Sequence, residues 1–327
     1  MSRRVCILVL LAALLLSACG SVGVAPEERL IRVGFSQVGS ESDWRMANTA
    51  SMTAALSEAN GYELIFDNAK QRQENQLLAI RNFIQQDVDY IVLAPIAESG
   101  WDDVLQEAKS AGIPVIIVDR QIAVKDENLS TSWVGSDFLA EGQRAVRWLE
   151  ELLERQGRGG DTIRILHIQG TDGATAQLLR TQALEDALEG HPNWKVIGRL
   201  PGEYTEAKSY ELVRDFLASG QAIDVIYSEN DNMSFGAIRA LEEAGIPCGT
   251  DNGVIILSFD AVRKALRLCE EGKISLCVEC NPLHGPRVAA LLRQLEDGET
   301  PAKQTFVDET AFDSTELSDD IIRQREY

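Results

Sequence analysis

The chain has 327 residues, 45% of them hydrophobic and 25% charged, which is the composition of an ordinary globular protein. Its formal net charge is -20 at pH 7, from 51 Asp and Glu against 31 Lys and Arg. Because nucleic acid is recognised by basic surfaces, this charge argues against a DNA-binding repressor. Beyond an N-terminal signal, about 300 residues remain, enough for two domains of roughly 100–200 residues each.

Residues 1–18 have the pattern of an export signal. Arg3 and Arg4 form a basic end, residues 5–16 are an apolar run too short to span a bilayer, and small residues lead to Cys19. The ending Leu-Ser-Ala-Cys resembles the lipobox of bacterial lipoproteins, which implies cleavage before Cys19, lipid attachment to its sulfur and a tether over residues 19–30. An ordinary signal peptide with a chance cysteine is the alternative. We therefore expect an exported protein, lipid-anchored at the outer face of the cell membrane.

Short apolar runs alternate with amphipathic helical patterns along the rest of the chain. Runs that are almost continuously apolar suit strands covered on both faces, and the alternation predicts parallel βαβ units. The two series of strands predict an α/β protein with two doubly wound parallel-sheet lobes. The predicted strands are 32–37, 63–68, 90–96, 114–120 and 132–137, then 163–170, 195–200, 224–230 and 254–260; helical patterns include 74–86 and 101–111.

A short internal sequence repeat supports the division into two lobes. Residues 107–120 and 242–260 each contain a helix ending at Ala-Gly-Ile-Pro, followed by an apolar strand that ends in aspartate. Glycine at a helix C-terminus and proline after it stop the helix, so local chemistry explains the shared Ala-Gly-Ile-Pro sequence. It does not explain why both strands end on an acid, and we attribute the acids to a binding site.

Polar and aromatic residues gather after the predicted strands, where ligands of open parallel sheets bind. Carboxylates, guanidinium forks and amides together suit a sugar, because they can bond neighbouring hydroxyls while an aromatic face covers the C–H face of the ring. Opposite charges neutralise one another, which favours an uncharged ligand. The candidates are Glu41, Trp44, Arg45, Asp119, Arg120, Arg180, Asn230, Asp260 and Glu279, with Asn281 nearby and more aromatic surface from Phe35 or Trp101.

Each candidate also has a structural alternative. Asp119 and Arg120 could form a solvated loop pair, and Arg180 could be a surface helix residue. Asp260 could cap a helix beginning near Ala261, a common use of aspartate. Trp44 could pack in the core. We favour the site because the candidates share one edge of the predicted sheets.

The chain resembles the periplasmic sugar-binding proteins of ABC importers, of the ribose-binding type, over residues 31–327. The resemblance is carried by "VGFSQVGSESDWR", "QENQLLAIRNFIQQDVDYIVLAPI", "GWDDVLQEAKSAGIPVIIVDR", "END" and "SFDAV". The first segment points to the galactofuranose-binding branch of that family, in which Glu41 and Arg45 would favour galactofuranose over pyranoses. The family's ligand contacts carry over to Glu41, Trp44, Arg45, Asp119, Arg120, Arg180, Asn230 and Asp260. Cys280 stands where simpler relatives have a polar hinge contact. The chain departs from the family pattern here, so the family's contacts do not carry over to the neighbouring Glu279.

The resemblance implies a type I periplasmic binding protein fold and its hinge motion. The N-terminal lobe would comprise residues 31–136 plus 281–309, and the C-terminal lobe residues 137–280 plus 310–327. Three crossings, near 135–138, 280–282 and 307–310, would let the lobes close around the sugar.

The resemblance also implies a transport function without catalysis or cofactor. The protein would capture galactofuranose, or a related galactose or pentose sugar, and deliver it as a monomer to an ABC permease and its ATPase. A sugar receptor that presents its ligand to a sensor kinase or chemoreceptor is the alternative. An enzyme is disfavoured, because neither a nucleophile–base pair nor a cofactor fingerprint is present.

The cysteines suggest a disulfide rather than a metal site. Cys277 and Cys280 have a Cys-x-x-Cys spacing, but no second pair lies near, and positions i and i+3 of a strand face opposite sides. We expect no metal. In an exported protein, a disulfide among Cys248, Cys269, Cys277 and Cys280 is plausible, with Cys269 and Cys277 the best placed pair.

Overall fold

The computed structural model describes residues 29–327. The predicted signal peptide, Cys19 and nearly all of the predicted tether lie outside these residues. None of the described helices is long and apolar enough to cross a membrane.

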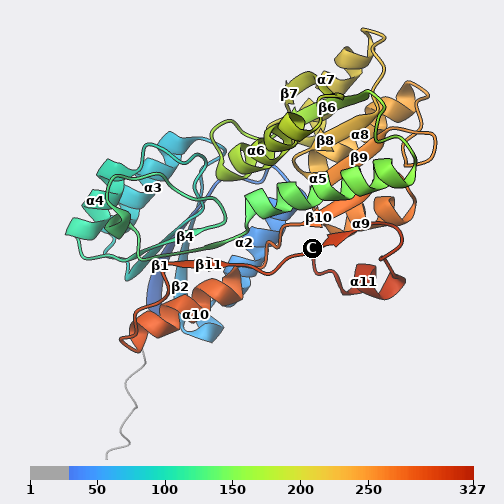
Figure 1. Ribbon diagram of the computed structural model, residues 1–327. Coiled ribbons are helices and arrows are strands. Elements are labelled where there is room, and N and C mark those ends of the chain that lie inside the picture. The colour runs from blue at the N-terminus through green and yellow to red at the C-terminus, as the bar shows by residue number, and fades with distance from the viewer. Residues whose placement is uncertain (1–28) are drawn as a thin grey trace, which may run out of the picture. The chain divides into compact units, whose positions relative to one another are not determined.

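The described strands form two six-stranded sheets of matching strand order (Figure 1). The first has the order β11-β5-β4-β3-β1-β2 and is entirely parallel. The second has the order β12-β10-β9-β8-β6-β7 and is parallel except where β12 pairs with β10. The first sheet consists of β1 (Ile31–Gln37), β2 (Tyr62–Asn68), β3 (Tyr90–Leu93), β4 (Val115–Val118), β5 (Ser132–Gly135) and β11 (Gln304–Phe306). The second consists of β6 (Ile163–Gln169), β7 (Trp194–Pro201), β8 (Val225–Ser228), β9 (Ile255–Asp260), β10 (Leu276–Glu279) and β12 (Ala311–Phe312).

Helices cover both faces of each sheet, because alternate side chains of a buried strand point to opposite faces. On the first sheet, α2 (Asp43–Ala55) and α10 (Gly285–Glu296) pack on one face, and α3 (Gln73–Gln85) and α4 (Asp102–Ser110) on the other. Short 3-10 turns η1 (Glu58–Asn60) and η2 (Glu127–Leu129) join elements of this half.

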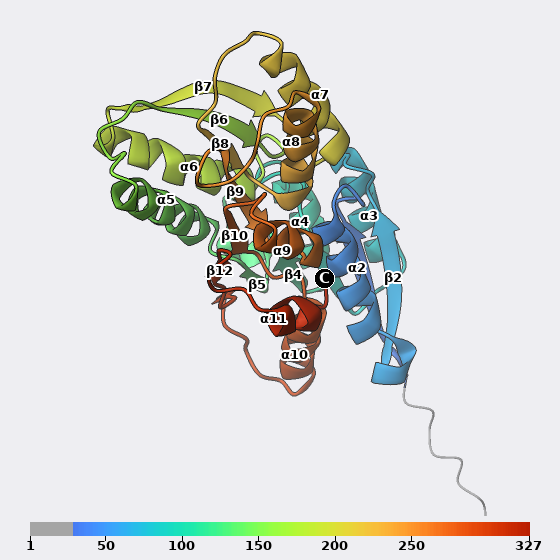
Figure 2. The same cartoon turned by 90° about the vertical axis from the view of Figure 1, so that its right-hand side faces the viewer.

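The second sheet is sandwiched in the same way (Figure 2). One face packs against α5 (Phe138–Arg155) and α6 (Thr175–Gly190), and the other against α7 (Glu206–Leu217), α8 (Asp231–Glu243), α9 (Arg263–Glu270) and the short α11 (Asp319–Gln324). The predicted fold class is therefore confirmed: two doubly wound halves, with the predicted strands in both.

The chain passes between the sheets three times, as predicted. It leaves the first sheet after Gly135, returns after Glu279 and leaves it again after Phe306. The repeated Ala-Gly-Ile-Pro sequence ends both helices as expected. Gly112 and Gly245 adopt left-handed φ angles of 75° and 70° just after the C-caps of α4 and α8.

Candidate functional site

Strand ends of both sheets surround one cavity. It contains about 310 Å³ of atom-free space, part of it open to solvent, and about 30 Å³ of space available to the centre of a water-sized molecule. Any ligand enclosed here must be small. Its lining consists of Glu41, Ser42, Trp44, Arg45, Asp119, Arg120, Phe138, Ala176, Arg180, Tyr204, Asn230, Asp260 and Cys280. The structure thus brings together every predicted contact except Glu279.

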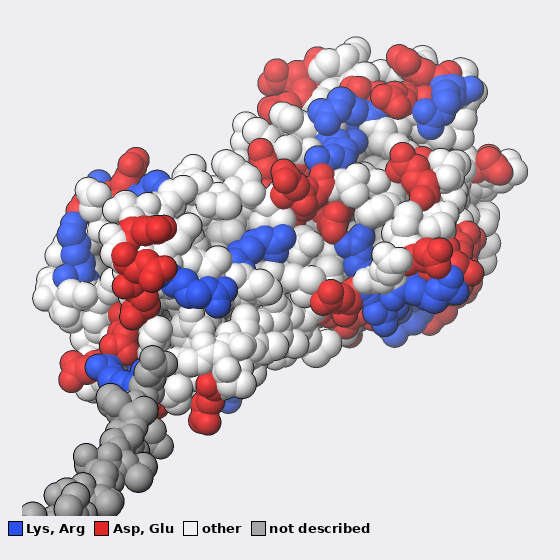
Figure 3. Space-filling view, turned by 90° about the horizontal axis from the view of Figure 1, so that it is seen from below, with Lys and Arg blue, Asp and Glu red and all other residues white. Residues whose placement is uncertain are grey.

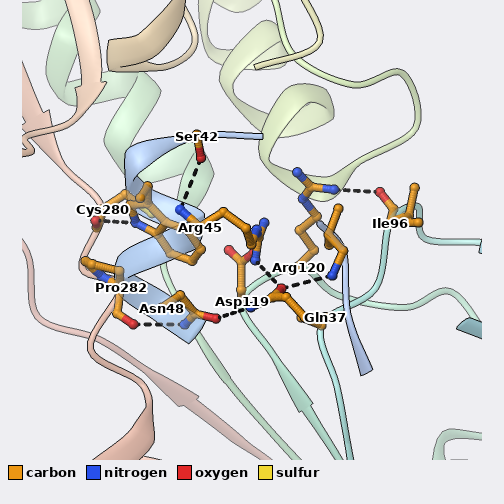
Figure 4. A network of polar contacts seen from close by, with 12 residues as sticks. Gln37, Ser42, Arg45, Asn48, Ile96, Asp119, Arg120, Cys280 and Pro282 are labelled. Atoms are coloured by element: carbon orange, nitrogen blue, oxygen red, sulfur yellow. Dashed lines mark hydrogen bonds and ion pairs between the residues drawn. The ribbon is translucent and has the colours of Figure 1, made fainter. Parts of the chain in front are cut away.

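Arg45 is the centre of the charge network in the first half (Figure 4). Its Nε lies 3.1 Å from Glu41 Oε1, and its Nη2 lies 2.8 Å from Asp119 Oδ2. Burial lowers the pKa of Arg45, but the carboxylates of Asp119 and Glu41 outweigh it and raise that pKa above its ordinary value. Arg45 therefore stays charged, and its fork fixes both acids at the cavity wall.

Neutral hydrogen bonds hold this fork in place. Ser42 caps α2 by accepting from the Arg45 backbone N–H (3.1 Å), and Gln37 Oε1 accepts from Arg45 Nη1 (3.2 Å). Asn48 Oδ1 accepts from Gln37 Nε2 (2.9 Å), and Asn48 Nδ2 donates to the carbonyl of Pro282 (2.8 Å). The stretch after β1 is thus a preorganised site wall, which explains its unusual content of acid, aromatic and guanidinium groups.

Arg120 reaches across the cavity toward the second half. Its Nη1 donates to the carbonyl of Ile96 (2.9 Å), and its guanidinium carbon lies 5.1 Å from the centre of the Tyr204 ring. Burial and the nearby charge of Arg45 lower the pKa of Arg120. The Tyr204 hydroxyl is buried without a hydrogen-bond partner, which is costly unless a ligand bonds it.

Arg180 holds the charges of the second half. Its Nη2 lies 2.6 Å from Glu141 Oε2 and 3.9 Å from Asp260 Oδ1. The guanidinium carbon lies over the rings of Phe138 and Phe259, at 5.3 and 4.8 Å from their centres. Such cation–aromatic contacts help to fix the position of the fork. The alternative that Arg180 is a surface residue is wrong, since it is 2% exposed.

The aspartates that end the two repeated segments occupy equivalent places. Asp119 follows β4 and Asp260 is the last residue of β9, and each of these strands is third in the order of its sheet. Asp119 has φ of 66° and Asp260 φ of 110°, a strain of roughly 1–3 kcal/mol each that typically marks ligand sites. Burial and the neighbouring Asp231 carboxylate raise the pKa of Asp260 well above its usual range. Asp260 does not cap α9; instead Asp231 Oδ2 accepts from the Val262 N–H (2.8 Å).

Aromatic surface comes from residues that the sequence only partly identified. Trp44 lines the cavity, its indole N–H donating to the carbonyl of Cys280 (2.7 Å). Phe138 supplies a second ring. Phe35 and Trp101, the other predicted aromatic candidates, pack in the cores on opposite faces of the first sheet.

Glu279 lies outside the lining. Its carboxylate accepts from Tyr327 (2.9 Å), Arg325 and the Thr310 N–H (3.3 Å). The C-terminal tail therefore occupies this side chain. Asn281, the other crossing residue considered, is also absent from the lining, and its side-chain oxygen accepts from the Leu283 N–H (2.9 Å).

Ser42, Phe138, Ala176, Tyr204 and Cys280 line the cavity but were not predicted. A signal for Tyr204 was available, because it follows the predicted strand 195–200 by a few residues, as the other candidates follow theirs. The four described cysteines, Cys248, Cys269, Cys277 and Cys280, carry free thiols, so the expected disulfide is not present in this structure.

Hydrogen bonds join the two rims of the cavity. The Asp43 N–H donates to Asn232 Oδ1 (3.0 Å), the Gln121 N–H to Thr175 Oγ1 (2.9 Å) and the Glu98 N–H to the carbonyl of Gly173 (3.0 Å). The structure is therefore a closed form, in which the lining side chains are largely shielded from water.

Comparisons with known proteins identify the family of the chain. The family model for the periplasmic binding protein domain matches residues 33–300. The galactofuranose-binding protein YtfQ of Escherichia coli K12 is 36% identical, over 86% of this chain and 87% of its own. A Mycobacterium smegmatis protein solved with β-D-fucofuranose is 38% identical, covers 87% of this chain and 92% of its own, and has a TM-score of 0.82. The binding protein of an arabinose ABC transporter from Shewanella sp. ANA-3 was solved with α- and β-L-arabinofuranose. It is 36% identical, covers 90% of this chain and 95% of its own, and has a TM-score of 0.83.

Proposed function

The chain belongs to the periplasmic binding protein family, and from this premise we propose that it captures a monosaccharide in its five-membered, furanose ring form. D-Galactofuranose, D-fucofuranose and L-arabinofuranose share the configuration of ring carbons 2 to 4. They differ only in the group that ring carbon 4 carries. A site that reads the common ring edge would accept all three, and the space beyond carbon 4 would set the preference among them.

The observation that carries the proposal is the charge balance of a buried, polar lining. Glu41 and Asp119 face Arg45 and Arg120 in the first half, and Glu141 pairs with Arg180 in the second. The raised pKa of Asp260 favours its neutral form. A charged ligand would leave a charge uncompensated in this site, whereas a neutral polyol can bond the carboxylate and hydroxyl oxygens that lack donors.

Calorimetric titration tests the sugar class. We expect D-galactose, D-fucose and L-arabinose to bind, and D-glucose, which differs at carbon 4, to bind far more weakly. The ring form is tested with two locked analogues: 1,4-anhydro-D-galactitol, a fixed furanose, should bind more tightly than 1,5-anhydro-D-galactitol, a fixed pyranose. Binding of none of these sugars, or preference for the pyranose analogue, would contradict the proposal.

We further propose that the bound sugar is delivered to an ABC permease and its ATPase by a monomeric, non-catalytic protein. Family membership supports an exported binding protein. Cells lacking this protein should lose uptake of the sugar that binds it, and the protein should return that sugar chemically unchanged. Normal uptake together with loss of a sugar response would instead identify a sensory receptor.

Cys19 is our proposed lipid anchor, on the strength of the Leu-Ser-Ala-Cys sequence. The wild-type protein should fractionate with membranes, and mass spectrometry should find a diacylglyceryl group on Cys19. The variant Cys19→Ala should lose both properties. A soluble wild-type protein whose mature chain begins elsewhere would show that the segment is an ordinary signal peptide.

A further inference from the structure

The three crossings between the sheets meet at one carboxyl group, that of Glu309. Glu309, on the third crossing, accepts hydrogen bonds at Oε1 from the hydroxyl of Ser136 on the first crossing (2.7 Å) and from the N–H of Asn281 on the second (2.6 Å). No predicted ligand contact is involved in this junction. Any rotation of one half against the other must alter the surroundings of Glu309.

A second buried carboxylate faces this junction, and one of its two oxygens lacks a donor. Glu141, on α5, is 1% exposed, and its Oε1 atom has no hydrogen-bond partner. Ligand atoms of Glu141, Cys280 and Glu309 all lie within 4.8 Å of one another. Two ionised carboxylates this close repel each other in a buried site, whereas a proton on one of them removes this repulsion.

The neighbouring groups favour a proton over a metal ion. Ser136 uses its only proton toward Glu309, so in its 3.3 Å contact with Cys280 Sγ the thiol is the donor. Burial raises the pKa of Cys280 well above its usual range, which keeps that thiol protonated. The Arg180 guanidinium at Glu141 Oε2 would repel a divalent cation. These groups make a proton, and not a divalent cation, the fitting occupant of the pair.

We propose that Glu309 and Glu141 share one proton in the folded protein and hold it most tightly in the closed form, so that closure around the sugar takes up further protons at the junction of the crossings. The sugar-linked part rests on the proposed function; the proton site itself does not. Since Glu141 also holds Arg180, which lines the sugar cavity, the shared proton is linked to the binding site through a single ion pair.

The electrostatics of the junction agree with this assignment. Burial and the Glu141 carboxylate raise the pKa of Glu309 from its ordinary value of 4.5 to about 9, against the lowering effects of the Asn281 and Ser136 bonds. Burial likewise raises the pKa of Glu141, although Arg180 opposes it. The other titratable or charged groups that act on the junction are Cys280, Glu279 on β10 and, through Cys280, Asp260 on β9.

Glu309→Gln is the diagnostic variant, because an amide can keep both accepted hydrogen bonds and donate to Glu141 without titrating. In the wild type, calorimetry with D-galactose in phosphate and in Tris at pH 7.5 should show uptake of up to one proton per sugar. Affinity should fall by up to tenfold per pH unit as the pH rises toward about 9. The variant should show neither effect and should bind as the wild type does at low pH. Glu279→Gln, the control, should keep both effects, in a slightly lower pH range because the Glu279 charge no longer raises the pKa of Glu309. Equal proton uptake in wild type and Glu309→Gln would overturn the inference.

A measurement without sugar keeps the inference separate from the proposed function. A folded-state pKa above the unfolded value gives stability that is full below about pH 4.5 and is lost as the pH rises through the folded-state pKa of Glu309. Chemical unfolding should therefore show the wild type losing stability relative to Glu309→Gln over this range. Parallel curves, or stabilisation of the wild type but not the variant by added Zn²⁺ at pH 8, would refute the proton site even if no sugar binds.

Discussion

The Tyr204 hydroxyl offers a sharp test of the cavity, because Tyr204→Phe removes one oxygen atom and little else. The hydroxyl is buried in the lining and has no hydrogen-bond partner in the protein. Burial raises the pKa of Tyr204, so the group is a neutral donor at any working pH. A sugar oxygen is the partner that this position predicts.

The expected loss follows from a single neutral hydrogen bond. Such a bond contributes about 0.5–1.5 kcal/mol net, which corresponds to a roughly 2- to 12-fold increase in Kd. Calorimetry on D-galactose, D-fucose and L-arabinose measures it, and the sugar with the largest change identifies the hydroxyl that Tyr204 contacts. The free energy of unfolding should not fall, because no bond within the protein is lost.

Tyr90→Phe is the matched control. The Tyr90 hydroxyl donates to Glu296 Oε1 (2.6 Å) at the far end of the first sheet. Its removal should lower stability and leave the Kd for every sugar unchanged, the opposite pattern from Tyr204→Phe. An unchanged Kd for all three sugars in Tyr204→Phe would refute the placement of the ligand.

Three further predictions concern separate parts of the molecule. Arg120→Ala should raise the Kd at least tenfold in calorimetry, because it leaves the Ile96 carbonyl and the sugar without a donor, at about 1–3 kcal/mol per buried group; an unchanged Kd would contradict this. Glu279→Gln should lower the free energy of unfolding by about 1 kcal/mol through its weakened contact with Arg325, with no change in sugar affinity. Burial lowers the pKa of His284 to about 4, so stability should fall as the pH drops from about 6.5 toward 4, where only the unfolded chain binds the proton. Urea unfolding across this range should show a flatter profile in His284→Phe, and identical profiles would exclude His284 as the cause.

The fold was predictable because each strand carries its own signal. Runs such as Tyr90–Leu93 and Ile255–Asp260 are apolar on both faces, and that pattern is sufficient for a covered parallel strand. The strands β10, β11 and β12 are absent from the predicted ranges. β10 has four residues, and β11 and β12 have three and two. The exposed residues of Gln304–Phe306 give no apolar run to detect.

The site was predictable to the extent that strand ends define it. Asp119, Asn230 and Asp260 follow apolar strands directly, so their positions could be read from the chain. Glu279 also ends a strand, but the direction of its side chain depends on Arg325 and Tyr327, which only the folded C-terminal tail brings near. The same limit applies to the junction of the crossings, whose members lie between positions 136 and 309 and carry no shared motif.

The ion pairs of the cavity lie within each half of the protein, so the two halves can separate although the cavity lining is charged. Arg45, Glu41 and Asp119 all belong to the first half, while Arg180, Glu141 and Asp260 belong to the second. Opening the cavity therefore separates none of these ion pairs, so that Arg45 and Arg180 keep their carboxylate partners. The rims are joined instead by neutral hydrogen bonds of roughly 0.5–1.5 kcal/mol each, which is within the range that the bonds to one sugar can supply. Because the charges are already paired within each half, the free energy of sugar binding is available for closure.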